Sequence, residues 1–218
     1  MTRWWEWEEA FPIEPDGTAL LVVDMQQGFI EPGSVLEVPM AREQIPVIQA
    51  LIEGFRERGM PVAYTRFVAR EDHFLPFYRS RAPQRGLDLA APRSMFAPDS
   101  DDAKIDERLA PREGEIVVDK IAYDGFHQTE LDDRLRSRGI DTLVHCGTVV
   151  NWCVDSTLRA AFHRRYQNVV VADGVSGYEH AGASGEDWVA RELDFFAEAL
   201  ATVLRAEDVL AELGASET

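Results

Sequence analysis

Short apolar runs alternate with amphipathic segments along the chain. The apolar runs predict buried strands at 18–24, 61–65, 115–120, 142–147 and 168–172, and a short edge strand at 201–204. Apolar residues at helical spacing predict helices at 40–58, 129–138, 154–162, 184–200 and 206–213. Alternating strands and helices predict an α/β fold, here a single-domain, Rossmann-like three-layer α/β/α sandwich with a mostly parallel sheet of about six strands.

Two segments fall outside this pattern. Residues 1–17 read as an N-terminal aromatic arm before a domain at 18–213, and the arm's tryptophans would be costly if exposed. We expect them to pack on the domain or on a second subunit. Residues 66–103 lack clear periodicity, which is typical of a functional loop or lid but also of a solvated insertion. The arginines of this segment can bind a substrate carboxylate or pair with acidic groups: Arg66, Arg70, Arg79, Arg81, Arg85 and Arg93.

Charge and composition narrow the possible partners. The 218 residues carry a formal net charge of −17, which repels nucleic-acid phosphates and anionic lipid. No apolar run approaches the roughly 20 residues that cross a membrane. The first residues lack the features of a signal peptide, so we expect a cytoplasmic protein. These features predict a small-molecule substrate, with no nucleic acid and no membrane as partner.

Three reactive side chains lie at or just beyond the ends of predicted strands. Asp24 ends the first strand, Lys120 ends the third, and Cys153 lies between the fourth strand and its helix. In a parallel sheet these ends share the carboxyl edge, where ligands bind. A cysteine near a helix N-terminus is expected to have a lowered thiol pKa. The alternatives are a structural Asp–Lys pair and a cysteine that serves as a small buried apolar residue.

The three groups together would support nucleophilic catalysis. Asp24 can accept the thiol proton and return it to a leaving amine, and Lys120 can stabilise both negative charges. Cys153 can attack a carbonyl carbon to give a thioester that water cleaves. The backbone N–H groups of Val149 and Cys153 can hold the oxyanion.

An ordered set of motifs resembles the isochorismatase-like cysteine hydrolases over about residues 18–204. The matching motifs are VVDMQ at 22–26, KIAYDGFHQTEL at 120–131, Gly147, CVDST at 153–157, Arg159-Ala160 and ADG at 172–174. The resemblance implies an Asp24–Lys120–Cys153 triad and a cis peptide at Thr148–Val149 that turns the Val149 N–H toward the oxyanion. It also implies an oligomer, which we expect to be a homodimer or homotetramer.

Departures from the family pattern refine these expectations. Nicotinamidases of the family carry an Asp-x-His metal motif where this chain reads Thr65-Arg66-Phe67, and Asp72-His73 follows later without partners. We therefore expect no metal and no cofactor. Isochorismate ether hydrolases often lack the cysteine, so its presence favours amide chemistry. The aromatic arm is loosely similar to that of members acting on ureido compounds.

Several residues near these motifs are candidates for substrate binding. Phe29 and Trp152 can line a small pocket, and ordinary core packing is the alternative for both. Tyr123 and Phe126 follow Lys120 and can flank the site. Gln26 can bind the substrate or brace Lys120, and Asn151 can bind substrate or stabilise its own turn. Tyr178, beyond the fifth strand, is a weaker candidate.

The sequence thus predicts a hydrolase acting on non-peptide C–N bonds, a cysteine-dependent amidohydrolase that cleaves a small carboxamide or ureido compound and releases ammonia. A vinyl-ether hydrolase of the isochorismate type, with Asp24 as general acid and no nucleophile, is the first alternative. A non-catalytic binding protein that keeps the fold is the second, and the intact Asp, Lys and Cys argue against it.

Overall fold

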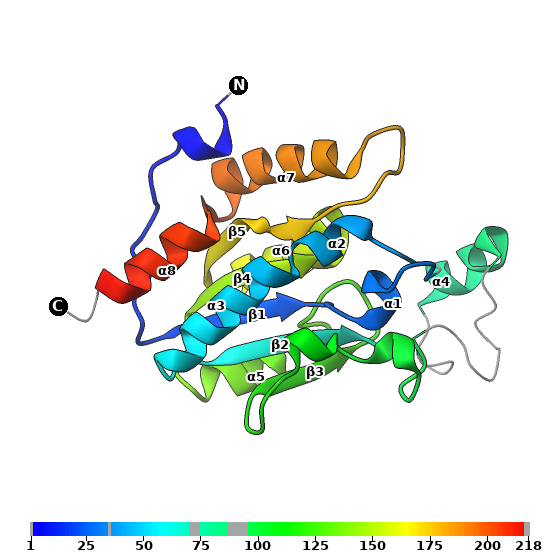
Figure 1. The fold of residues 1–218 in the computed structure, drawn as a ribbon, viewed down its shortest axis with the longest axis horizontal. Coiled ribbons are helices and arrows are strands. Elements are labelled where there is room, and N and C mark those ends of the chain that lie inside the picture. The colour runs from blue at the N-terminus through cyan, green and yellow to red at the C-terminus, as the bar shows by residue number, and fades with distance from the viewer. Residues whose placement is uncertain (1, 35, 70–74, 87–95, 216–218) are drawn as a thin grey trace.

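Six parallel strands form one sheet through the centre of the molecule (Figure 1). The structure is a computed structural model that describes residues 2–34, 36–69, 75–86 and 96–215. The strand order is β3-β2-β1-β4-β5-β6. The strands are β1 (Thr18–Val23), β2 (Val62–Phe67), β3 (Ile116–Lys120), β4 (Thr142–Thr148), β5 (Gln167–Ser176) and β6 (Thr202–Leu204). The apolar runs therefore became strands, and the predicted sheet is confirmed.

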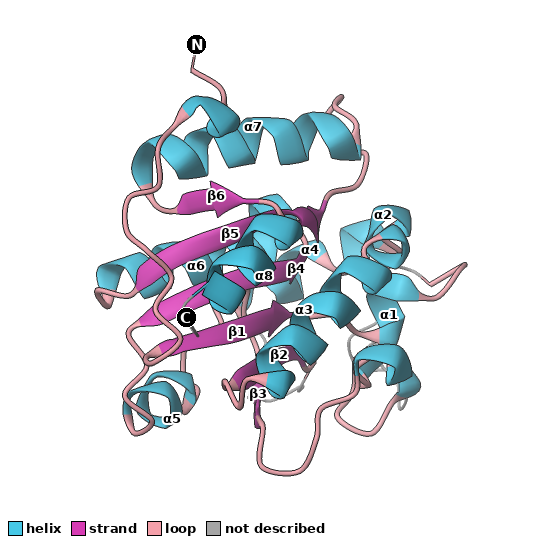
Figure 2. Cartoon of the chain, turned by 60° about the vertical axis from the view of Figure 1, so that its left-hand side comes forward, coloured by secondary structure: helices cyan, strands magenta, loops and turns pink. Residues whose placement is uncertain are grey.

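Helices cover both faces of the sheet (Figure 2). They are α1 (Gln27–Ile30), α2 (Pro39–Glu43), α3 (Ile45–Glu57), α4 (Pro76–Arg81), α5 (Leu131–Arg136), α6 (Asp155–His163), α7 (Gly185–Ala199) and α8 (Ala206–Ala215). Leu20 and Val22 of β1 join one core with α3 and α8, whereas Ala19 and Leu21 join a second core with α5, α6 and α7. Because successive side chains of a strand point to opposite faces, the fully buried strand β1 contributes to both cores.

Shorter elements fill the connections. Turns of 3-10 helix lie at Trp4–Glu6, Pro83–Arg85, Asp101–Ala103 and Glu107–Leu109, and a π-helical turn at Val150–Val154 joins β4 to α6. No helix in the described ranges is long and apolar enough to cross a membrane.

Three elements differ from the sequence expectation. The helix predicted at 40–58 is broken at Gln44, whose side-chain amide donates to the carbonyl of Val175 and so ties the α2–α3 junction to β5. The predicted loop after β1 contains the short helix α1. Strand β5 continues to Ser176 through a register shift against β4, so Asp173 and Gly174 lie inside the strand and not beyond it.

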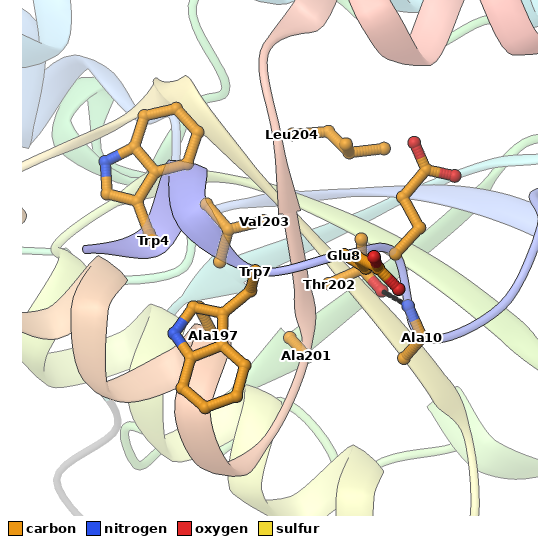
Figure 3. A pocket seen from close by; sticks show the side chains of 10 residues that line it. Trp4, Trp7, Glu8, Ala10, Ala197, Ala201, Thr202, Val203 and Leu204 are labelled. Atoms are coloured by element: carbon orange, nitrogen blue, oxygen red, sulfur yellow. Dashed lines mark hydrogen bonds between the residues drawn. The ribbon is translucent and has the colours of Figure 1, made fainter. Parts of the chain in front are cut away.

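The N-terminal segment runs along β6, α7 and α8 of its own chain. The backbone N–H of Trp4 donates to the buried carboxylate of Asp194 at 2.8 Å, and that of Ala10 donates to Thr202 Oγ1 at 3.2 Å. Trp4 and Trp7 line a small crevice against the end of α7 and β6 (Figure 3). The side chain of Trp5 is 58% exposed, so the arm is only partly covered by its own domain. Packing of the arm on a second subunit stays a prediction.

Gly147 permits the close pairing of β1 and β4 just below the carboxyl edge. It pairs with Val23 in the parallel register and has φ +114. A Cβ at this position would lie 2.1 Å from the carbonyl oxygen of Val23. Any side chain would therefore push apart the two strands that lead to Asp24 and Cys153.

We expect Gly147→Ala to lower the free energy of unfolding by about 3 kcal/mol, because it adds a backbone clash to an unfavourable φ. Gly59→Ala is the matched control, since Gly59 has φ +67 but a Cβ there meets no described atom within 4 Å. Gly59→Ala should lower the free energy of unfolding by only about 1 kcal/mol. Urea unfolding of both variants checks this, and equal losses would contradict the role given to the clash.

Candidate active site

Asp24, Lys120 and Cys153 meet at the carboxyl edge of the sheet. Asp24 directly follows β1, Lys120 is the last residue of β3, and Cys153 lies in the π-helical turn after β4. The Lys120 Nζ is 2.7 Å from Asp24 Oδ2 and 3.3 Å from Cys153 Sγ. Strand β2 separates β1 from β3, and the Lys120 ammonium lies 5.5 Å from the ring centroid of Phe67 at the end of β2. The long lysine side chain therefore bridges three strand ends.

Asp24 is held from the neighbouring strand. Its backbone N–H donates to the carbonyl of Thr65 at 3.2 Å, and the Thr65 hydroxyl donates to Asp24 Oδ1 at 2.7 Å. The residue has φ +50, a left-handed conformation that Asp tolerates better than most residues. The second oxygen, Oδ2, is the one that faces Lys120.

Lys120 is fully buried and has an acceptor for each of its three protons. Besides Asp24 and Cys153, its Nζ donates to the carbonyl of Ala122 at 2.9 Å. Burial by itself lowers the pKa of a lysine, but the charge of Asp24 and the hydrogen bonds to Asp24 and Cys153 outweigh it, and the pKa of Lys120 is raised. The ammonium form is therefore the resting state.

The thiol of Cys153 differs from the sequence expectation. The residue is 7% exposed, and burial raises the pKa of its thiol, while Lys120 opposes that shift and Asp24 adds to it. The helix N-terminus was expected to lower this pKa, and desolvation is the stronger effect. The resting cysteine is therefore a thiol that needs a base, and Asp24 is the carboxylate in its surroundings.

The turn that carries Cys153 has an unusual backbone. The N–H groups of Trp152 and Val154 both donate to the carbonyl of Val149. The N–H of Cys153, which lies between these two residues in the chain, takes part in neither bond. Asn151 lies in the bridge region at φ −97 and ψ 17. The cis peptide that the family resemblance implied is present at Thr148–Val149. π-Helical turns inside helices are frequent at functional sites.

A row of aromatic rings crosses the same edge of the sheet. Successive ring centroids lie 4.4–6.5 Å apart along the row. The row consists of Tyr78, Tyr123, Trp152, Tyr178, His180 and Trp188. Burial raises the pKa of the Tyr78 hydroxyl. The Tyr78 ring lies 6.4 Å from the ring of Phe67, which is the ring next to the Lys120 ammonium. Tyr78 and His180 were not among the predicted site residues.

Three other candidates lie in the core. Phe29 packs on Phe96 with ring centroids 4.5 Å apart, and Phe126 packs on Tyr166 at 5.7 Å. The buried amide of Gln26 donates to the carbonyls of Phe67 and Ala103 and accepts from the N–H of Phe67. These contacts account for the three side chains without a substrate. Gln26 braces the segment after β2 and does not touch Lys120 through these bonds.

The arginines of 66–103 have different surroundings. Arg66 forms a two-bond ion pair with Asp119 at 2.7 and 2.8 Å. The guanidinium of Arg81 donates a hydrogen bond to Gln84 Oε1 at 2.8 Å and lies over the ring of Phe77. Arg79 also has an interaction partner. Arg70, Arg93 and the side chain of Arg85 lie outside the described residues. The segment thus contributes the rings of Phe67 and Tyr78 to the surroundings of Lys120.

Metal coordination is not visible in the described part of the chain. It contains no group of three or more His, Cys, Asp or Glu side chains placed to hold a metal ion. Asp72 and His73 lie outside the described residues.

An α/β sandwich in which a thiol, an ammonium and a carboxylate meet at the carboxyl edge has the layout of a cysteine hydrolase. The model of the isochorismatase domain matches residues 18–208, and the chain belongs to the isochorismatase family. The ureidoacrylate amidohydrolase RutB of Methylobacterium radiotolerans is 33% identical over 178 residues, which cover 76% of this chain and 69% of the relative. RutB of Azorhizobium caulinodans is 32% identical over 180 residues, which cover 76% of this chain and 78% of the relative.

Solved structures agree with this assignment. A cysteine hydrolase from Pseudomonas syringae pv. phaseolicola superposes with a TM-score of 0.84 at 31% identity, covering 95% of this chain and 97% of that one. N-carbamoylsarcosine amidase from Thermoplasma acidophilum superposes with a TM-score of 0.71 at 31% identity. The match covers 87% of this chain and 96% of the amidase chain. The chain is therefore an enzyme, a hydrolase acting on C–N bonds.

We expect Lys120→Met to lower the free energy of unfolding by about 3–5 kcal/mol, because it leaves the buried Asp24 carboxylate without its cation. The double variant Asp24→Asn with Lys120→Met should recover part of this loss. Arg66→Met is the matched control, since it removes a partly exposed pair worth less than about 1 kcal/mol. Urea unfolding measures all three, and equal losses in the two single variants would contradict the prediction.

The raised pKa of Cys153 also predicts its reactivity. A group with a raised pKa loses its proton only at higher pH, so thiolate is scarce at neutral pH. We expect alkylation of Cys153 by iodoacetamide to be slow near pH 7 and to keep accelerating above about pH 9, beyond the range of an ordinary thiol. Mass spectrometry of the modified peptide follows the rate, with Cys153→Ala as control. A rate that levels off below about pH 8 would contradict it.

Proposed function

We propose that this protein hydrolyses a small carboxamide or ureido compound through a thioester on Cys153 and releases ammonia. The observation that carries the proposal is the buried contact of Lys120 Nζ with both Asp24 and the Cys153 thiol, at 2.7 and 3.3 Å. The names of the similar proteins, a ureidoacrylate amidohydrolase and an N-carbamoylsarcosine amidase, support the substrate class.

The first half of the proposed reaction forms the thioester. The Asp24 carboxylate takes the thiol proton, and the Cys153 thiolate attacks the substrate carbonyl carbon. The N–H groups of Val149 and Cys153 would hold the oxyanion that results. The C–N bond then breaks as Asp24 returns the proton to the leaving nitrogen, which departs as ammonia.

The second half releases the acid. Asp24, again a carboxylate, accepts a proton from a water molecule that attacks the thioester carbonyl. The C–S bond breaks, and the proton held by Asp24 restores the Cys153 thiol. Lys120 stays an ammonium throughout and stabilises whichever neighbour is negative. Every step uses protein groups, substrate and water, so the proposal includes no cofactor.

The aromatic surroundings favour a small, planar substrate. Tyr123 and Trp152 make an edge-to-face contact with ring centroids 5.2 Å apart, and Tyr78 contacts Tyr123 at 5.3 Å. Flat faces of this kind suit a planar amide or ureido group. We assign substrate contact to Tyr123, Trp152 and Asn151, with Tyr78 as an addition from the structure. A homodimer or homotetramer stays part of the proposal.

Ammonia release from nicotinamide, biuret, ureidoacrylate, maleamate and N-carbamoyl amino acids tests the proposal. We expect the wild type to turn over at least one compound and Cys153→Ser to lose at least about a thousandfold in kcat, because the nucleophile is removed. Cys146→Ala is the matched control, since Cys146 is a buried strand residue whose thiol contacts the carbonyl of Leu21, and it should keep most of the activity.

Two results would contradict the proposal. One is amide hydrolysis by Cys153→Ser at the wild-type rate. The other is no amide turnover at all, together with consumption of isochorismate by both wild type and Cys153→Ala. The second result would establish the vinyl-ether alternative.

A further inference from the structure

His180 and Asn151 form a hydrogen-bonded pair beside the turn that carries Cys153. The Nδ1 of His180 is 2.9 Å from the carbonyl oxygen of Tyr178, and its Nε2 is 3.1 Å from Asn151 Nδ2. A carbonyl oxygen only accepts, so Nδ1 carries the proton. An amide nitrogen only donates, so Nε2 must accept and carries none. A neutral imidazole with its proton on Nδ1 satisfies both contacts.

Two stacked rings and several hydrogen bonds hold the ring of His180 in place. It stacks on Tyr178 with centroids 4.4 Å apart and on Trp188 at 4.7 Å. The indole N–H of Trp188 donates to the backbone carbonyl of His180 at 3.1 Å. Backbone bonds between His180 and Ala183 in both directions close the loop. This ring position and tautomer leave Asn151 one orientation in which its Nδ2 donates to His180.

That orientation decides what Asn151 offers to a ligand. With Nδ2 bound to His180, the carbonyl oxygen Oδ1 points the other way, and it is buried without a hydrogen-bond partner among the described residues. A buried polar atom without a partner is costly and rare in folded proteins. Asn151 shares the turn Val150–Val154 with Cys153 and stands two residues before the nucleophile.

We propose that Asn151 Oδ1 accepts a hydrogen bond from the N–H group of the substrate, and that His180 is the positioning residue that keeps this oxygen available. The inference rests on the proposed function and refines it. Asn151 would select for carboxamides and ureido compounds, which bring an N–H donor to the site. It would not favour the ester of the same acid, which brings no donor and leaves Oδ1 unpaired.

The test compares an amide that the wild type hydrolyses with the methyl ester of the same acid. We expect Asn151→Leu to lower kcat/KM for the amide by about tenfold or more and to change that for the ester by less than about threefold. His180→Phe keeps the stacked ring but removes the acceptor for Asn151, so it should lower the same amide preference, mainly through KM.

Rescue separates positioning from simple packing. His180→Gln offers Asn151 a carbonyl acceptor again and should restore part of the preference for the amide, although it stacks less well than phenylalanine. His127→Phe is the control, because His127 is exposed. In ¹⁵N-histidine spectra of the wild type, His180 should be the Nδ1-protonated tautomer, which is a readout that does not depend on turnover.

The outcomes separate this inference from the function on which it rests. If the wild type hydrolyses amides through Cys153, but Asn151→Leu and His180→Phe lower amide and ester turnover equally, the inference is wrong and the proposed function stands. Finding the His180 proton on Nε2 would also overturn it. If the wild type hydrolyses neither amides nor esters, the proposed function fails and this inference fails with it.

Discussion

The buried ammonium of Lys120 is the constraint on which the rest of the site depends. Removing a charged group from water costs several kcal/mol even after relaxation, and this lysine is fully buried. It is tolerated because Asp24, Cys153 and the carbonyl of Ala122 accept its three protons. These acceptors come from different segments of the chain. The strand ends must therefore come together accurately, or the charge would be left without partners.

The fold provides this accuracy through its tightest contacts. Gly147 lets β4 approach the backbone of Val23, one residue before Asp24. Thr65 of β2 holds Asp24 by both backbone and side chain. The triad is consequently a property of the parallel sheet edge, whereas the aromatic row above it comes from loops and helices. Substrate preference can vary with those segments while the charged cluster stays the same.

The sequence was sufficient for the strands and for the meeting of Asp24, Lys120 and Cys153 at one edge, and insufficient where position depends on tertiary contacts. Apolar runs marked β1, β3 and β4, and their polar ends pointed to Asp24 and Lys120. The break at Gln44 has a signal in the sequence, Pro46 in the first turn of α3, whereas the hydrogen bond of Gln44 to Val175 in a distant strand could not be foreseen. Strand β5 was ended too early at Ala172. His180, four residues beyond the true end of β5 at Ser176, was not among the candidates.

Residue type alone was also a poor guide to reactivity and binding. Proximity to a helix N-terminus suggested an acidic thiol, but the desolvation of Cys153 is visible only in the folded protein. Phe29 and Gln26 lie next to Asp24 in sequence, yet one packs on Phe96 and the other bonds to backbone groups. Tyr78 comes from a segment without periodicity, so no pattern could place it against Phe67 and Tyr123 beside Lys120.

The raised thiol pKa fits a reaction that keeps the net charge of the buried cluster constant. With a thiol, an ammonium and a carboxylate, the cluster holds one positive and one negative charge. Losing the thiol proton to solvent would leave a second negative charge in a desolvated place, which burial opposes. Passing the proton to Asp24 moves the negative charge to sulfur and leaves the ion pair with Lys120 balanced. In the proposed reaction the thiolate therefore forms only when Asp24 holds the proton, which is also the proton that the leaving nitrogen needs.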